Sequence, residues 1–529
     1  MSGTFSNTGK LTRFILRRER VNIGLWLAAL MLTACISAVL EAQPNEEIIQ
    51  ALTARQNPIR IAIQGPVFGL EYSLAGNLFA SQMLLFKIVA VAIMNIFMVI
   101  RHTRGDEEKG RYEVMLSLPV GRLAMLHATM ITAIFMNIAV AITQGLTLWV
   151  LGVSGIDLAG AFTYGAVLGV SGLFFAALAA LCAQLTHSAR DATNYVFILL
   201  LAAYLLRAVG DTTNEFLALI SPIGLIMRAE AFAQNYLLPI FFVLTLAFLV
   251  GGLAYLLNAR RDIEQGLLPQ RKGKAHASVF LISPTGLAWR LNRSTFISWA
   301  AGMLIFGVAL GGLLGEAELF GESEAFRMMM PQAYAFPPTE LFTMLINTIL
   351  ALVCIAPIII LISKLKVEET EQRTQQILSS AVSRAKHLAG YVIIAFIASV
   401  LIPFLTTLGL WVVGFFMMDN PISFGTMLLA IMVYVPALWV VLGFAVFIVG
   451  RFPRAMMLCW AYYAFIFVAG FFGDLLRLPE WAMRLSPIYF IPRLPLEEVN
   501  IIILLVMTFV AGGLTLIGFV FYRRRDIAN

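Results

Sequence analysis

The chain has 529 residues, of which 60% are hydrophobic and only 13% are charged, and its mean hydropathy is +0.86. Soluble domains are nearer half apolar and a quarter charged, so this composition excludes an ordinary soluble protein and indicates a polytopic membrane protein. The formal net charge of +7 is then explained by orientation in the bilayer, and we expect no nucleic-acid partner.

Twelve apolar runs are long enough to cross a hydrocarbon core, which requires roughly 17–25 residues. We therefore predict an all-α polytopic membrane protein with about twelve transmembrane helices. The runs lie near residues 22–41, 81–100, 123–151, 157–186, 193–209, 237–257, 295–314, 341–363, 388–416, 422–449, 455–471 and 499–521.

Basic residues concentrate in alternate connections between these runs. If both termini lie inside, the cytoplasmic segments hold most of the 37 Lys and Arg residues, and the remaining segments are net acidic. Because basic loops stay on the cytoplasmic side, we expect a multi-pass protein of the inner or plasma membrane, in contact with lipid, with both termini cytoplasmic.

A densely charged stretch, residues 101–122, lies between the second and third apolar runs. A short helix from Asp106 to Leu118 would place its acidic residues favourably in the first turn, against the helix dipole, and Pro119 would end it. Such a rigid charged helix would suit a cleft in a partner protein. The alternative is a solvated loop held by ion pairs between its own side chains.

A weaker copy of this stretch occupies residues 364–384. Pairs of like residues recur between the two parts of the chain: Glu107 with Glu369, Arg111 with Arg373, Arg122 with Arg384, Ser221-Pro222-Ile223 with Ser486-Pro487-Ile488, and Arg260-Arg261-Asp262-Ile263 with Arg524-Arg525-Asp526-Ile527. The chain is therefore an internal duplication. Six spans in each copy give both copies the same orientation, which predicts parallel repeats.

The duplication divides the chain into three parts. We predict a first six-span half at residues 1–257, a polar and basic cytoplasmic linker at 258–282, and a second six-span half at 283–529. Near the start of each half, residues 10–20 and 284–293 combine apolar and basic residues in a pattern typical of an interfacial helix. An ordinary basic flank of a transmembrane helix is the alternative.

The sequence carries no recognisable enzyme chemistry. Nothing fits the phosphate-binding pattern G-x-x-x-x-G-K-[ST], because Gly273-Lys274 lacks both the preceding glycine and the following hydroxyl residue. There is also no nucleophile–base–acid set and no H-E-x-x-H. The five histidines lack metal-ligand spacing, and the four cysteines fall inside apolar runs. We therefore predict no catalytic residue, no metal site and no cofactor bound by this chain.

Ionisable residues are scarce inside the apolar runs, where Lys87 and Arg207 are the clear basic ones. Ion-coupled transporters normally need such groups at membrane depth, and Lys87 would reach the outer interface by extending along its helix. The apolar runs therefore contain few ionisable residues that could form a proton or sodium relay. This favours transport powered by a separate protein that hydrolyses ATP.

The chain resembles the fused, twelve-span membrane subunit of a type-II ABC exporter, of the bacterial polyketide-antibiotic and multidrug exporter group. The motifs that carry the resemblance are EEKGRYE at 107–113, LSLPVGR at 116–122, ARRDI at 259–263 and GLLP at 266–269. The resemblance implies an elbow helix before the first span of each half, at residues 11–20 and 285–293. It also implies a coupling helix after the second span of each half, at residues 107–122 and 369–384, that docks on a separately encoded ATPase.

The resemblance assigns a coupling role to residues of both charged stretches. These are Glu107, Glu108, Gly110, Arg111, Glu113, Pro119, Arg122, Glu368, Glu369, Arg373 and Arg384. The second stretch departs from the family pattern, because Gln372 replaces the glycine and Ala381 replaces the proline. Whether the two docking sites are equivalent therefore stays open.

The resemblance also implies a substrate path where the two halves meet, lined by the second and fifth spans of each. The candidates are Asn95, Phe97, Tyr195, Phe197, Tyr204, Thr343, Asn347, Trp460, Tyr462 and Tyr463. Aromatic and Met-rich walls suit amphipathic cargo because they adapt without demanding one hydrogen-bond pattern. Ordinary packing between spans is the alternative for each of these residues.

Our leading hypothesis is a permease subunit that exports hydrophobic or amphipathic compounds, such as antibiotics or drugs. Two copies of a partner ABC ATPase would bind ATP and Mg on the cytoplasmic face and supply the energy. The direction of transport follows from the resemblance alone. The alternatives are an ion-coupled secondary drug antiporter and a non-transporting membrane scaffold or sensor.

Overall fold

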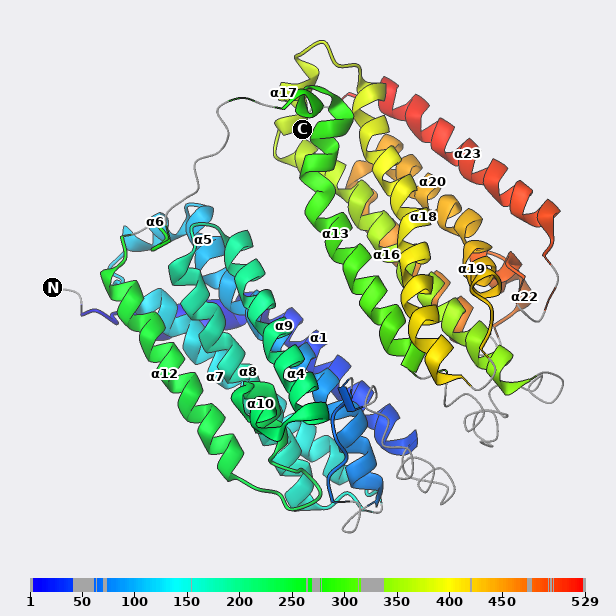
Figure 1. The fold of residues 1–529 in the computed structure, drawn as a ribbon. Coiled ribbons are helices and arrows are strands. Elements are labelled where there is room, and N and C mark those ends of the chain that lie inside the picture. Colours follow the sequence, from blue (N-terminus) through cyan, green and yellow to red (C-terminus); the bar gives the residue numbers. More distant parts are fainter. Residues whose placement is uncertain are drawn as a thin grey trace. The chain divides into compact units, whose positions relative to one another are not determined.

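The computed structural model describes residues 3–40, 61–62, 64–69, 74–153, 155–262, 265–268, 276, 278–312, 314, 337–418, 421–472, 478–492, 494, 497 and 499–526. The chain folds as two compact units, Met1–Lys272 and Gly273–Asn529. Figure 1 shows that each unit is a bundle of long helices. The division between the units falls inside the linker expected at 258–282, part of which lies outside the described residues.

Twelve helices in the described part of the chain are long and apolar enough to cross a membrane, and this part contains helices and no strands. The prediction of an all-α polytopic membrane protein is confirmed. The spans are Thr8–Ala38, Gly76–Glu108, Ala124–Val150, Leu158–Leu185, Ala189–Thr213, Leu238–Arg260, Pro284–Gly311, Thr339–Thr370, Arg384–Met417, Phe424–Arg451, Pro453–Gly470 and Ile501–Arg524.

The first unit is built around helix α8 (Leu158–Leu185), which packs against α4 (Leu74–His102), α7 (Ala124–Val150) and α12 (Leu238–Arg260). Glycines on α8 allow this close approach. A Cβ atom at Gly165 would lie 2.2 Å from the carbonyl oxygen of Ala141 on α7. Small residues let helix backbones come together where lipid provides no hydrophobic driving force between helices. Helices α1 (Thr8–Leu40) and α9 (Ala189–Thr213) complete the bundle.

The second unit repeats this plan with α13 (Pro284–Gly311), α16 (Pro338–Thr370), α18 (Arg384–Met417), α21 (Met457–Phe472) and α23 (Ile501–Arg524). Its fourth span differs from that of the first unit. Here the span consists of α19 (Phe424–Met432) and α20 (Val435–Arg451), separated by a turn. Pro436 stands near the start of α20, where its missing N–H is tolerated. In a helix that ran unbroken from α19 into α20, the same proline would be an obstacle.

Neither interfacial helix is a separate element. Residues 10–20 belong to α1, and residues 284–293 belong to α13, with no break before the apolar run that follows in each case. The two basic segments are therefore the starts of long helices. Whether they lie in the membrane interface stays a prediction.

Short helices connect the fifth and sixth spans of each unit. In the first unit they are α10 (Glu215–Ile220) and α11 (Pro222–Met227). In the second unit they are α22 (Glu480–Met483) and the 3-10 helix η5 (Pro487–Phe490).

The first charged stretch is not the single helix expected from Asp106 to Leu118. It forms α5 (Arg104–Glu108) and α6 (Arg111–Leu116), which are separated by Gly110 in a left-handed conformation with φ of 66°. The expectation of one helix was wrong because the chain turns at this glycine. In the second unit α17 (Arg373–Leu378) also follows a left-handed residue, which is Gln372 with φ of 58°.

The two left-handed positions give a stability prediction. A Cβ at Gly110 would meet no other atom within 4 Å, so Gly110→Ala tests backbone strain without introducing a steric clash. We expect it to cost about 1 kcal/mol, which corresponds to roughly fivefold faster local hydrogen exchange of residues 108–117. Gln372→Gly removes the same strain, but it increases the conformational entropy of the unfolded chain by an amount worth about 0.4–1 kcal/mol. Exchange of residues 370–379 should therefore change less than twofold. Equal acceleration in both variants would contradict the strain assignment.

Candidate functional site

The candidate site consists of the two charged segments, which we define as the first charged segment (residues 101–122) and the second charged segment (residues 364–384). In each unit the segment continues directly from the second long helix, α4 or α16, and leads into the third, α7 or α18. Figure 1 shows α5 and α6 together at one end of the first bundle and α17 at one end of the second.

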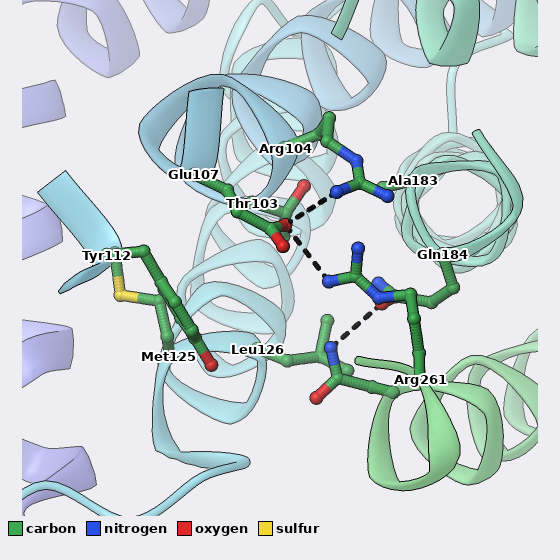
Figure 2. Close-up of a pocket in the computed structure, with 10 residues that line it drawn as sticks. Thr103, Arg104, Glu107, Tyr112, Met125, Leu126, Ala183, Gln184 and Arg261 are labelled. Carbon is green, nitrogen blue, oxygen red and sulfur yellow. Dashed lines mark hydrogen bonds and ion pairs between the residues drawn. The ribbon is translucent and has the colours of Figure 1, made fainter. Parts of the chain in front are cut away.

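Part of the first charged segment is buried in the unit rather than exposed to solvent. Glu107 lies between two guanidinium groups, with its Oε2 3.1 Å from Arg104 Nη1 and 3.0 Å from Arg261 Nη2. All three side chains are buried, and Figure 2 shows both arginines directed at the carboxylate. Burying an ion is costly unless an opposite charge lies close to it in good geometry, and here one carboxylate serves two guanidinium groups.

Backbone oxygens complete the environment of the two arginines. Arg104 donates to the carbonyl groups of Thr186 and Gln265, and Arg261 Nη1 donates to the carbonyl of Gln265 at 2.8 Å. The cluster borders a cavity of about 20 Å³, room for about one water molecule. These contacts join α5 to the end of α8 and to the residues that follow α12.

Tyr112 closes another side of this cavity. Its hydroxyl donates to the carbonyl oxygen of Arg122 at 2.9 Å. Burial raises the pKa of the Tyr112 hydroxyl, and the nearby Glu107 carboxylate acts in the same direction. The hydroxyl therefore stays protonated at neutral pH and remains a hydrogen-bond donor.

A second ion cluster joins the first charged segment to α1. Asp106 accepts bonds of 2.8 Å from Arg18 and from Arg111. Glu19 is paired with His102 at 2.8 Å and with Arg101 at 3.0 Å. The basic segment at residues 10–20 therefore binds the first charged segment through Arg18 and Glu19. The sequence did not indicate this contact.

The amino-terminal residues hold the far end of the first charged segment. The carbonyl oxygen of Pro119 accepts hydrogen bonds from Ser6 Oγ at 2.9 Å and Asn7 Nδ2 at 2.7 Å. The Leu123 amide donates to the carbonyl of Thr4 at 3.1 Å. The loop that follows α6 is therefore fixed to the start of the chain.

The remaining part of the first charged segment faces outward. Glu108, Arg111, Glu113, Pro119 and Arg122 are exposed among the residues assigned to coupling. Two exposed apolar side chains lie four residues apart in this part of the chain, Val114 on α6 at 69% exposure and Leu118 just beyond the end of α6 at 59%. The sequence pattern did not indicate a role for either side chain. We call Glu108, Arg111, Glu113, Val114 and Leu118 the first outer surface.

The second charged segment repeats this division between buried and exposed residues. Glu368 is buried and paired with Arg373 at 3.2 Å. Glu369 is largely enclosed and paired with Arg525 at 2.6 Å. The positions that align with Val114 and Leu118 are Gln376 and Ser380, and both are exposed. The two segments thus share ion pairs made by enclosed carboxylates but differ in the chemistry of their exposed faces.

The path candidates of the first unit fall into two groups. Phe97 on α4 and Phe197 on α9 lie side by side, with ring centroids 5.8 Å apart, and Phe97 and Tyr195 are exposed at the surface of the unit. Tyr204 packs under the guanidinium of Arg207, 5.0 Å from ring centroid to Cζ. Asn95, however, is buried inside the unit.

Asn95 makes a reciprocal amide pair with Asn137 on α7. The two hydrogen bonds measure 3.0 and 2.7 Å. Such paired amides satisfy each other inside a membrane bundle. The contacts of Asn95 are therefore those of a residue that joins α4 to α7.

The path candidates of the second unit divide in the same way. Trp460 is exposed, and its ring centroid lies 6.1 Å from that of the partly exposed Tyr463. Tyr462 is partly buried and donates its hydroxyl to the carbonyl of Leu485 at 3.0 Å. Thr343 and Asn347 are buried within the unit.

Lys87 does not reach the surface, contrary to the expectation that it extends to the outer interface. It is only 4% exposed, and its Nζ donates to Gln144 Oε1 on α7 at 2.9 Å. The ammonium also lies 5.4 Å from the ring centroid of Phe79 and 5.5 Å from that of Tyr164. Aromatic faces and an amide oxygen thus hold this cation inside the first unit.

Among the residues that the structure describes, no three His, Cys, Asp or Glu side chains are grouped as metal ligands would be. The sequence pattern did not indicate that Arg104, Arg261 and Arg525 are parts of the site. A signal for two of them was present, because Arg261 and Arg525 occupy the same place in the repeated Arg-Arg-Asp-Ile motif.

These features define a multi-pass membrane protein of two similar helical units, each with one charged segment attached to its end. The family model described as "Multidrug efflux system permease Rv1217c, C-terminal domain" matches residues 11–257 and again 281–523, once in each half. The chain therefore belongs to this family of multidrug efflux permeases. It is also 30% identical to the multidrug efflux system permease protein Rv1217c of Mycobacterium tuberculosis (strain ATCC 25618 / H37Rv). That alignment covers 99% of this chain and 96% of the relative.

The buried cluster predicts a large effect from a small change. Glu107→Gln keeps the shape of the side chain but leaves Arg104 and Arg261 without their shared anion. Removing one member of a buried ion pair typically costs about 3–5 kcal/mol, so the melting temperature of the purified protein should fall by several degrees. Glu113→Gln, on the exposed face of the same segment, is the matched control and should change stability by less than about 0.5 kcal/mol. Equal melting temperatures for the two variants would contradict the assigned role of Glu107.

Proposed function

We propose that this chain is the membrane subunit of an ATP-driven ABC exporter of the type-II class, which moves hydrophobic or amphipathic compounds such as drugs or antibiotics out of the cell. The observation that carries the proposal is the repeated charged segment, with an outward face supported by an ion pair between an enclosed carboxylate and an arginine in each unit. Membership in a multidrug efflux permease family supports the transport of drug-like cargo.

The energy source in this proposal is a separate ABC ATPase present in two copies. The sequence lacks a phosphate-binding loop, so ATP and Mg would be bound by the partner. One copy would contact the first outer surface and the other the exposed face of the second charged segment. Because these ends carry much of the basic charge, we place them and both termini on the cytoplasmic side of the inner or plasma membrane.

Cargo in this proposal passes along the second and fifth helices of each unit. Exposed aromatic side chains on these helices, including Phe97, Tyr195 and Trp460, provide large apolar contact surfaces without a fixed hydrogen-bond pattern. ATP-driven closure of the two ATPase copies would shift the units between inward-open and outward-open states.

The first outer surface provides a direct test, because the second charged segment supplies a ready-made substitution. In Val114→Gln with Leu118→Ser, the first segment carries the residues of the second. Burial of an apolar side chain contributes about 1.5–3 kcal/mol. Partial burial of two should therefore make the affinity for the proposed partner ATPase about tenfold weaker, measured by titration of the purified proteins.

The matched control is the reverse exchange, Gln376→Val with Ser380→Leu, which leaves the first outer surface intact and should not weaken binding. Arg111→Glu is a second probe, since it reverses an exposed charge and breaks the 2.8 Å pair with Asp106. We expect it to abolish the stimulation of ATP hydrolysis by the permease. Unchanged affinity and unchanged stimulation in these variants would count against the proposed docking role.

A second candidate function is ion-coupled drug antiport, and the burial of Lys87 favours it. An ionisable side chain held inside a membrane bundle is a natural candidate for ion coupling. If this function were correct, a pH gradient across the vesicle membrane would drive dye transport by the chain alone, without nucleotide. Lys87→Met would abolish this transport. In the ATP-driven function, vesicles without the ATPase show no uptake, with or without this substitution.

A further inference from the structure

Each unit connects its charged segment to the end of its last helix through one arginine. In the first unit this residue is Arg261, which directly follows α12. Its Nη2 lies 3.0 Å from Glu107 Oε2, and its carbonyl oxygen accepts a bond of 2.5 Å from Arg122 Nη2. Side chain and backbone of Arg261 are thus bound by residues before and after α6.

The second unit makes the same two contacts. Arg525 follows α23, and its Nη2 lies 2.6 Å from Glu369 Oε1. Its carbonyl oxygen accepts a bond of 2.5 Å from Arg384 Nη1. Glu369 aligns with Glu107, and Arg384 aligns with Arg122. We call the two arrangements, Glu107–Arg261–Arg122 and Glu369–Arg525–Arg384, the arginine ties.

The surroundings of the ties have diverged between the units. The first unit has the pair of Glu19 with His102, whereas the aligned positions in the second unit are Asn292 and Lys364. Other changes include Gly110 to Gln372, Tyr112 to Thr374 and Pro119 to Ala381. The ties have kept both residue types and contacts while the positions around them changed.

Stability alone is a weak reason to keep such a contact. Pairs that are partly open to solvent contribute about 0–1 kcal/mol, and buried pairs are often replaceable by apolar side chains without loss. Arginine nevertheless offers a planar, permanently charged fork that binds a carboxylate and backbone oxygens in one geometry. Arg261 also donates to the Gln265 carbonyl, and Arg525 to the Val449 carbonyl at 2.6 Å. The ties therefore hold a defined orientation between two structural elements.

We infer that Arg261 and Arg525 are positioning residues that transmit movement of each charged segment to the last helix of its own unit. The covalent chain already connects the segments to α4 and α16, and to α7 and α18. The ties add α12 and α23, which the chain reaches only much later. A push on the outward face of a charged segment would then move the second, third and sixth spans together. This inference rests on the proposed docking of an ATPase at these segments.

The test uses the full-length permease in complex with its partner ATPase in lipid nanodiscs. Hydrogen exchange is measured over residues 255–262 and 519–526, with and without trapping by Mg-ATP and vanadate. Arg261→Gln and Arg525→Gln remove the guanidinium groups of the ties. Arg260→Gln and Arg524→Gln are the matched controls, since these neighbouring arginines are exposed.

We expect trapping to change exchange at the ends of α12 and α23 in the native chain and in both controls. In Arg261→Gln and Arg525→Gln the change should shrink at least about fivefold in the affected unit, in line with typical coupling between sites. Arg525 is less enclosed than Arg261, so its variant tests the inference even if Arg261→Gln does not fold.

A charge exchange separates transmission from simple loss of structure. Within the described residues Glu369 and Arg525 have no third charged side chain at ion-pair distance. Glu369→Arg with Arg525→Glu keeps an ion pair but not the bond to the Val449 carbonyl, so it should restore part of the change that Glu369→Arg or Arg525→Glu alone loses. The inference is overturned if trapping leaves exchange at these ends unchanged in the native complex, or if the single variants keep the full change. Failure of any ATPase to assemble with the native chain would instead overturn the proposed function.

Discussion

The paired burial of charge at the ends of the two bundles is the constraint on which the charged segments depend. Moving a single ion out of water costs several kcal/mol, and an opposite charge offsets this cost only in good geometry. Glu107 meets this condition through Arg104 and Arg261, and Glu369 meets it through Arg525. These pairs fix one face of each segment to its unit, which leaves the other face rigid and exposed.

The sequence predicted the architecture well because the determining signals are long and repeated. Twelve apolar runs were sufficient to locate the spans, and pairs such as Glu107 with Glu369 revealed the duplication. The break at Gly110 was harder to foresee. A glycine within a charged, helix-forming stretch has a modest cost in a helix, and only the surrounding contacts decide that the chain turns there.

The roles of individual site residues were less predictable, because they depend on contacts between distant parts of the chain. Glu107 and Glu108 are neighbours of the same type, yet Glu107 is enclosed by arginines and Glu108 faces outward. In the same way Phe97 is exposed and Asn95 is buried against Asn137. Sequence spacing indicates which residues share a helix, but the neighbouring helix decides which of them meet solvent.

The separation of Glu107 and Arg261 by 154 residues also has a consequence for biogenesis. At roughly 5–20 residues per second, a ribosome takes about 8–30 seconds to add that length. During this interval four further spans enter the membrane. Of the two arginines that finally flank Glu107, only Arg104 has been synthesised by then. The ion pair between Glu107 and Arg261 can form only when the sixth span of the unit is complete. The second unit repeats the sequence of events on its own, so two separately translated half-chains, divided in the linker, would each contain everything needed to neutralise their own buried acids.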